Sequence, residues 1–233
     1  MANALGTINT TTEVPDSISG NTKLSTGDSL VINKTSGLGI KVDTTTPTFP
    51  WHDILGDLMN ARLPPATAPT LNTYRGNVQQ LQFAVGDFAL LNYHIPHDYA
   101  PGTDIFIHYH WSHIATTVTG GTVTWRIECT YAKGHNQAAW PATGTIDLSP
   151  APSTTQYQHM LSEVQLSAAS PAGGQLTTGL IEPDGLILVY VTLQANAITV
   201  SGGGVPDPFL HFADVHYQST NIGTKNNTPN FYA

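Results

Sequence analysis

The chain has 233 residues, of which only 10% are Asp, Glu, Lys or Arg, and its formal net charge is −8. An average soluble domain has about 25% charged residues, and helical surfaces depend on them, so this composition disfavours an all-α protein. The eight Lys and Arg residues form no basic run, so no nucleic-acid partner is expected. No apolar stretch reaches the ~18 residues of a membrane span, and no membrane partner is expected either.

Residues 1–46 form a polar, Thr-rich first region with two short β-branched runs, neither long enough to hold a core alone. A solvated tail is the simpler interpretation of this region, and an arm that orders on a neighbouring subunit is the alternative. The arm is favoured, because a solvated tail has no use for apolar runs flanked by turn residues. The docking candidates within it are Leu30, Ile32, Ile40 and Val42.

Residues 47–76 follow as a Pro-rich connector. Leu55, Leu58 and Met59 recur at helical spacing, which predicts one short helix from Trp51 to Arg62, ended by the paired prolines at 64 and 65. We expect the start of this segment to dock on a partner or on the next subunit, through Trp51, Asp53, Ile54 and Leu55.

From residue 77 to 220 the pattern changes to strands separated by Gly- and Pro-containing turns, and a polar tail follows at 221–233. Between Thr122 and Tyr131 apolar and polar residues alternate, with Trp125 and Cys129 on the apolar side, so this strand has one buried face. The run from Leu186 to Leu193 is apolar on both faces, which is typical of a central strand. The fold prediction is all-β, an antiparallel sandwich or jelly roll with an extended N-terminal arm. The strands are expected at 78–85, 88–95, 104–113, 122–131, 143–148, 157–166, 186–195 and 208–218.

The densest chemical signal is the segment from Asp104 to His113. On a strand, His108 and His110 share one face, and two histidines at this spacing can ligate one metal, whereas His113 falls on the other face. The segment also resembles the opening of the first cupin motif, but the glutamate of that motif is missing at positions 114 and 115. His211 and His216 are further candidate ligands that nothing in the sequence places nearby. A cupin-like metal enzyme is therefore the remotest of the functional hypotheses, and hydrogen-bonded histidines at a sheet or subunit surface are the simpler alternative.

No other pattern indicates catalysis, and no catalytic residue or cofactor is assigned. Gly-x-Ser-x-Gly, P-loop and dinucleotide motifs are missing, and the single cysteine, Cys129, belongs to the apolar set of its strand. The four tryptophans and nine tyrosines are compatible with stacking on sugar rings, so a glycan is an alternative partner. The first residues lack a cationic and an apolar segment, so no secretory signal is expected.

Three segments resemble a family of structural proteins of tailed-bacteriophage virions. Residues 48–56 (TFPWHDILG) resemble its W-x-D-[IL]-x-G segment, and residues 102–111 (GTDIFIHYHW) resemble its G-T-D-I-x-x-H-x-H-W strand. Residues 212–218 (FADVHYQ), followed by 221–224 (NIGT), resemble its closing F-D-I-H-Y-Q and S-x-G-S/T. The resemblance implies a non-catalytic β-sandwich component of the virion, and it leaves the role of residues 1–46 open.

The hypothesis for function is a capsid decoration or cement protein that oligomerises on the particle and stabilises it. A tail-associated appendage or a receptor that binds glycan is the alternative. A homotrimer is expected from the way jelly rolls cluster around threefold axes, with a major capsid protein or a tail or neck protein as the further partner. The expected location is the virion, after synthesis in the host cytoplasm.

Overall fold

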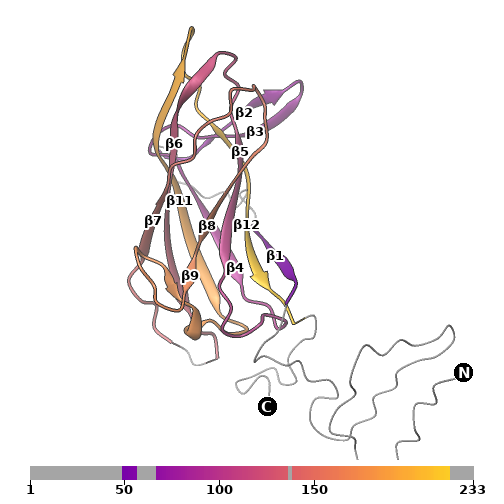
Figure 1. The fold of residues 1–233 in the computed structure, drawn as a ribbon, viewed down its shortest axis with the longest axis vertical. Helices are drawn as coiled ribbons and strands as arrows, with labels where there is room; N and C mark the ends of the chain where they lie inside the picture. The colour runs from indigo at the N-terminus through magenta and orange to yellow at the C-terminus, as the bar shows by residue number, and fades with distance from the viewer. Residues whose placement is uncertain (1–48, 57–66, 136–137, 221–233) are drawn as a thin grey trace, which may run out of the picture. The chain divides into compact units, whose positions relative to one another are not determined.

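Two antiparallel sheets face each other in the computed structural model, which describes residues 49–56, 67–135 and 138–220 (Figure 1). The first sheet contains β1 (Trp51–Gly56), β2 (Thr70–Arg75), β3 (Val78–Gln82), β5 (Phe106–Ser112), β8 (Met160–Gln165) and β12 (Phe209–Gln218). The second sheet contains β4 (Phe88–His94), β6 (Val118–Ala132), β7 (Gly144–Leu148) and β11 (Leu186–Val200). A small parallel pair, β9 (Ser167–Ala168) and β10 (Leu176–Thr177), precedes the 3₁₀ turn η1 (Thr178–Leu180).

The strand order is that of a jelly roll. Strands β3-β12-β5-β8 form four neighbours in the first sheet, and β4-β11-β6-β7 form the second. Along the strands of these two sheets from β3 to β12, the chain crosses from one sheet to the other at every step except the hairpin from β6 to β7, and the separate pair β9–β10 lies on the crossing from β8 to β11. The predicted all-β sandwich is confirmed, and all eight predicted strands are present with shifted ends.

The helix predicted for residues 51–62 is wrong, because Trp51–Gly56 is the strand β1. It pairs antiparallel with β12 over its whole length, from Trp51 opposite Gln218 to Gly56 opposite Ala213. The backbone hydrogen bonds offered by β12 and the burial of Ile54 outweigh the local helical spacing. The connector at 47–76 therefore supplies two strands of the first sheet, β1 and β2 (Figure 1). Positions 57–62 of the predicted helix, and the arm at 1–46, lie outside the described residues.

The core lies between the two sheets and is rich in aromatic side chains. Trp111 and Tyr109 from β5 and Trp125 from β6 are fully buried there. The predicted alternation of β6 is confirmed, since Val123, Trp125, Ile127 and Cys129 all face the core. The predicted central position of the 186–193 run is also confirmed, because β11 lies between β4 and β6. Burial of both indole rings fixes which face of each sheet is turned outward.

Strand β1 lies on the edge of β12 that is opposite to β5, and β3 pairs with the same edge near the other end of β12.

The described part of the chain contains no helix of the length and apolar character that crossing a membrane requires.

Candidate functional site

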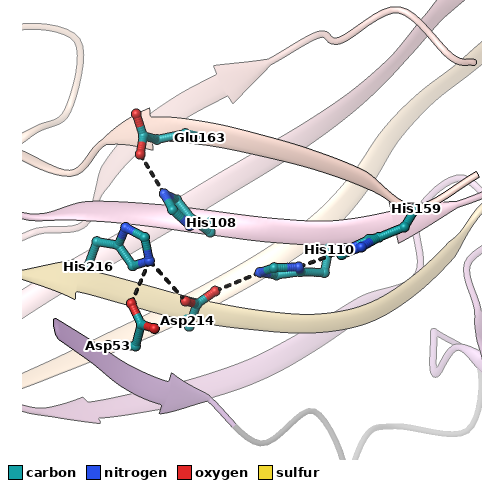
Figure 2. A network of polar contacts seen from close by, with 7 residues as sticks. All are labelled: Asp53, His108, His110, His159, Glu163, Asp214 and His216. Carbon is teal, nitrogen blue, oxygen red and sulfur yellow. Dashed lines mark hydrogen bonds and ion pairs between the residues drawn. The ribbon is translucent and has the colours of Figure 1, made fainter. Parts of the chain in front are cut away.

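The outward face of the first sheet carries a row of histidines and carboxylates (Figure 2). In β5 the alternation of side chains turns Tyr109 and Trp111 into the core and leaves His108 and His110 on the opposite face. The prediction that these two histidines share a face is therefore confirmed. In β12 the same alternation buries Ala213 and Val215 and turns the intervening Asp214 outward.

Strand register brings the members of this row together from four strands, except for His159, which directly precedes β8. Asp214 of β12 lies directly opposite His108 of β5, and Glu163 of β8 lies opposite His108 on its other side. Asp53 of β1 lies opposite His216 of β12. Residues directly opposite on antiparallel strands have Cβ atoms about 5 Å apart, so the side chains are in reach of one another. We call Asp53, His108, His110, His159, Glu163, Asp214 and His216 the histidine–carboxylate row.

Each histidine of β5 and β12 in the row contacts a carboxylate. Nε2 of His108 is 2.5 Å from Oε2 of Glu163, and Nε2 of His216 is 2.5 Å from Oδ1 of Asp53. Nε2 of His110 is 3.1 Å from Oδ1 of Asp214, and its Nδ1 is 2.8 Å from Nε2 of His159.

The densest group of possible metal ligands is His108, Asp214 and His216, not the predicted pair. One ligand atom from each lies within 4.8 Å of the other two. The ring centroids of His108 and His216 are 3.6 Å apart, whereas those of His108 and His110 are 6.3 Å apart. His110 lies beside this group and contacts it through Asp214. The sequence analysis named His108 and, as a further candidate, His216, but it placed neither His216 nor Asp214 beside His108.

Asp214 is a buried carboxylate that pairs with no Lys or Arg of the described residues. Its side chain is 6% exposed, and that of His108 is 5% exposed. The three Lys and Arg residues in the described ranges lie elsewhere: Arg126 pairs with Asp147, Lys133 pairs with Glu182, and Arg75 covers the ring of Tyr157. A buried carboxylate is costly unless it is paired with a positive charge. Among the described ion pairs of Asp214, the only partners are the histidines His110 and His216, which are charged only when protonated.

Two shallow pockets flank the row on the same face. The first is lined by Trp51, Phe106, Glu163 and His216. The rings of Trp51 and Phe106 pack edge to face, with their centroids 5.6 Å apart. The second is lined by Tyr74, Val78, Gln80, His159 and His211.

His211 lines the second pocket and has a lowered pKa. Burial, together with the neighbouring charges of His159 and His110, lowers the pKa of its ring to about 4. Its Nε2 lies 2.7 Å from the hydroxyl of Ser112, and its Nδ1 lies 3.2 Å from the amide oxygen of Gln80. His211, a candidate ligand in the sequence analysis, therefore contacts Ser112 and Gln80, and it is not part of the group formed by His108, Asp214 and His216.

The docking candidates of β1 divide between its two sides. Trp51, Asp53 and Leu55 are exposed, with Trp51 at 50% and Leu55 at 70%. Ile54 points the other way and packs against the core, so it does not provide a free docking surface. The other four candidates, Leu30, Ile32, Ile40 and Val42, lie outside the described residues.

A second cluster of histidines, which the sequence did not suggest, surrounds Asp184. Its carboxylate lies 3.1 Å from Nε2 of His97, 3.2 Å from Nε2 of His94 and 2.6 Å from Nε2 of His135. Burial acts to raise the pKa of Asp184, but the hydrogen bond from His135 and the charge of His97 outweigh it and lower the pKa below its ordinary value. His94 ends β4 and His97 lies in the segment that follows it, whereas His135 follows β6, so the fold brings His135 and Asp184 to the other two histidines.

No protein-family model and no curated protein matches the chain. Among solved structures, it is similar to the CBM22-1–GH10 modules of endo-1,4-β-D-xylanase 10B from Clostridium thermocellum, complexed with xylohexaose, at 11% identity and a TM-score of 0.35. That match covers 75% of this chain but only 30% of the xylanase chain. Two others are TmCBM61 in complex with β-1,4-galactotriose, at 11% identity and a TM-score of 0.25, and a family 11 carbohydrate-binding module from Clostridium thermocellum, at 8% identity and a TM-score of 0.27. The match to TmCBM61 covers 72% of this chain and 89% of the TmCBM61 chain. The match to the family 11 module covers 76% of this chain and 91% of the module.

Proposed function

We propose that the chain is a structural protein of a bacteriophage virion, a decoration or cement protein whose jelly-roll domain oligomerises on the particle. One observation supports this proposal most directly. The three segments that resemble the virion family are far apart in the sequence, yet they contribute β1, β5 and β12, which are adjacent strands of one sheet. The resemblance therefore corresponds to one continuous surface and not to scattered matches.

That surface has the character of a contact face. Trp51 and Leu55 expose large apolar side chains on β1, and Leu161 does so on β8. The row of histidines and carboxylates extends from β1 across β12 and β5 to β8 (Figure 2). An apolar patch beside a polar row is the composition of a protein–protein contact, where the apolar part gives affinity and the polar part gives register. We assign this face to contacts with another copy or with a capsid or tail protein.

The proposal is tested on purified particles of the phage that carries the gene. Peptide mass spectrometry should find the chain in the particles, and an antibody raised against the purified protein should label them in electron micrographs. Native mass spectrometry of the full-length protein then gives the subunit count, with three expected. Particles that contain none of the protein would overturn the proposal.

A receptor that binds glycan is the second candidate, and the pocket beside β1 favours it. Trp51 is half exposed beside Phe106, with the carboxylate of Glu163 and the ring of His216 in the same pocket. An aromatic face next to hydrogen-bonding groups is a suitable surface for a sugar ring. Binding to a glycan array should be lost in Trp51→Ala and retained in Trp140→Ala, since Trp140 is similarly exposed and lies outside this pocket. Equal binding by both variants would exclude the pocket.

A further inference from the structure

We propose that His108, Asp214 and His216 bind one divalent transition-metal ion, with zinc as the reference ion. The proposal does not depend on the role of the protein in a virion. It rests on the donor set, on the distances within it, on the charge around it, and on the way neighbouring side chains orient the histidines.

Two imidazoles and one carboxylate form the donor set of three-ligand zinc sites, in which water or a further ligand completes the coordination. Tetrahedral zinc with bonds of about 2.1 Å places its ligand atoms roughly 3.4 Å apart. The three candidate atoms already lie within 4.8 Å of one another. Small side-chain rotations are enough to close this gap, since all three residues stand on adjacent, paired strands.

The surroundings of the group favour a cation over an empty site. Asp214 is nearly buried, and the two carboxylates Asp53 and Glu163 lie against the histidines on either side. With neutral histidines these three groups place three negative charges on one face. A divalent ion at the centre neutralises most of that charge, and it supplies Asp214 with the permanent positive partner that the described Lys and Arg residues do not provide.

Glu163 occupies the position of a supporting residue, and Asp53 occupies that of a further ligand. Glu163 holds Nε2 of His108, which leaves the other nitrogen of that ring free to bind a metal. A carboxylate on the second ring nitrogen is the usual way in which proteins orient a metal-binding histidine. Asp53 contacts the same nitrogen of His216 that faces Asp214, so it is placed as the next carboxylate available to the ion. His110, bonded to Asp214, orients the third ligand.

The test uses the full-length protein, purified without a polyhistidine tag, stripped with a chelator and dialysed against zinc. Elemental analysis should find one zinc per chain, and the thermal midpoint should rise with zinc concentration because only the folded state holds the complete site. His216→Gln and Asp214→Asn should each abolish the stoichiometric zinc and the shift in midpoint. His110→Gln removes a supporting contact and should weaken binding by about 10- to 100-fold.

The matched control is His52→Gln, which alters a histidine of β1 that pairs with Asp98 and lies outside the proposed set. It should bind zinc as the wild type does. His216 is partly exposed, so His216→Gln provides the test even where Asp214→Asn perturbs folding. Absence of bound zinc in the wild type, or equal binding by wild type and His216→Gln, would overturn the proposal.

Discussion

Gly56 of β1 lies directly against the ring of Tyr93 of β4. A β-carbon at position 56 would be 2.6 Å from the Tyr93 hydroxyl oxygen and 2.4 Å from the carbonyl oxygen of Ala213. Neither distance is available to a real side chain, so only glycine lets the end of β1 approach both sheets. The glycine of the W-x-D-[IL]-x-G segment thus has a packing role.

Substitution Gly56→Ala should therefore loosen β1 from β12 and lower the free energy of unfolding by about 1–3 kcal/mol, the usual cost of overpacking. Chemical denaturation of the purified variant measures this change. Gly179→Ala is the matched control, because a β-carbon there has no atom within 4 Å. A Gly56→Ala variant as stable as Gly179→Ala would contradict the close packing of β1.

The buried indole of Trp111 depends on Ser162. Its Nε1 donates a hydrogen bond of 2.9 Å to the hydroxyl oxygen of Ser162, and both residues are buried. Ser162→Ala leaves this donor unsatisfied, so the free energy of unfolding should fall by about 1–3 kcal/mol. Ser149→Ala removes an exposed hydrogen bond to Thr124 and should change stability by no more than about 0.5 kcal/mol. Urea titrations of both variants make the comparison.

The lowered pKa of His211 makes stability depend on pH. In the unfolded chain this histidine takes up a proton near pH 6.5, whereas in the folded protein it does so only near pH 4. Between these values the unfolded state holds more protons, so the contribution of His211 to stability falls as the pH falls. His211→Gln should lose less stability than the wild type between pH 7 and pH 4.5 in urea unfolding. If both proteins lose stability in parallel, His211 is not the cause.

Cys129 should be unreactive in the folded protein. Burial raises the pKa of its thiol to about 11, so little thiolate exists at pH 8 and the sulfur is not accessible. Titration with a chromogenic thiol reagent should therefore detect no thiol in the folded protein and one thiol per chain in the protein unfolded by guanidinium chloride. Rapid labelling of the folded protein would show that β6 opens locally.

Local pattern was sufficient to predict most of the fold. The alternation around Trp125 and the apolar run of β11 each follow from the one or two buried faces of a strand. Strand β1 was missed because Leu55, Leu58 and Met59 follow helical spacing, while its partner in β12 lies about 160 residues further along the chain. An edge strand that is stabilised by such a distant partner leaves little local signal.

The site was predicted only where its residues are neighbours in sequence. His108 and His110 follow from their spacing on one strand, but Asp214, Asp53 and Glu163 join them through strand order and register. Those relationships are set by packing of the whole sandwich. The signal available in the sequence was the Asp-x-His spacing of Asp214 and His216, which puts both on one face of the last strand.

The position of Asp214 between Ala213 and Val215 also bears on the fidelity of folding. A slip of β12 by one residue against β5 would exchange its two faces, placing Asp214 and His216 in the interior and Val215 in water. An ionised carboxylate in that apolar layer is far less favourable than the native arrangement, so the native register is strongly preferred over the slipped one. The histidine–carboxylate row thus also helps to specify the register of β12 against β5, independently of any ligand that it binds.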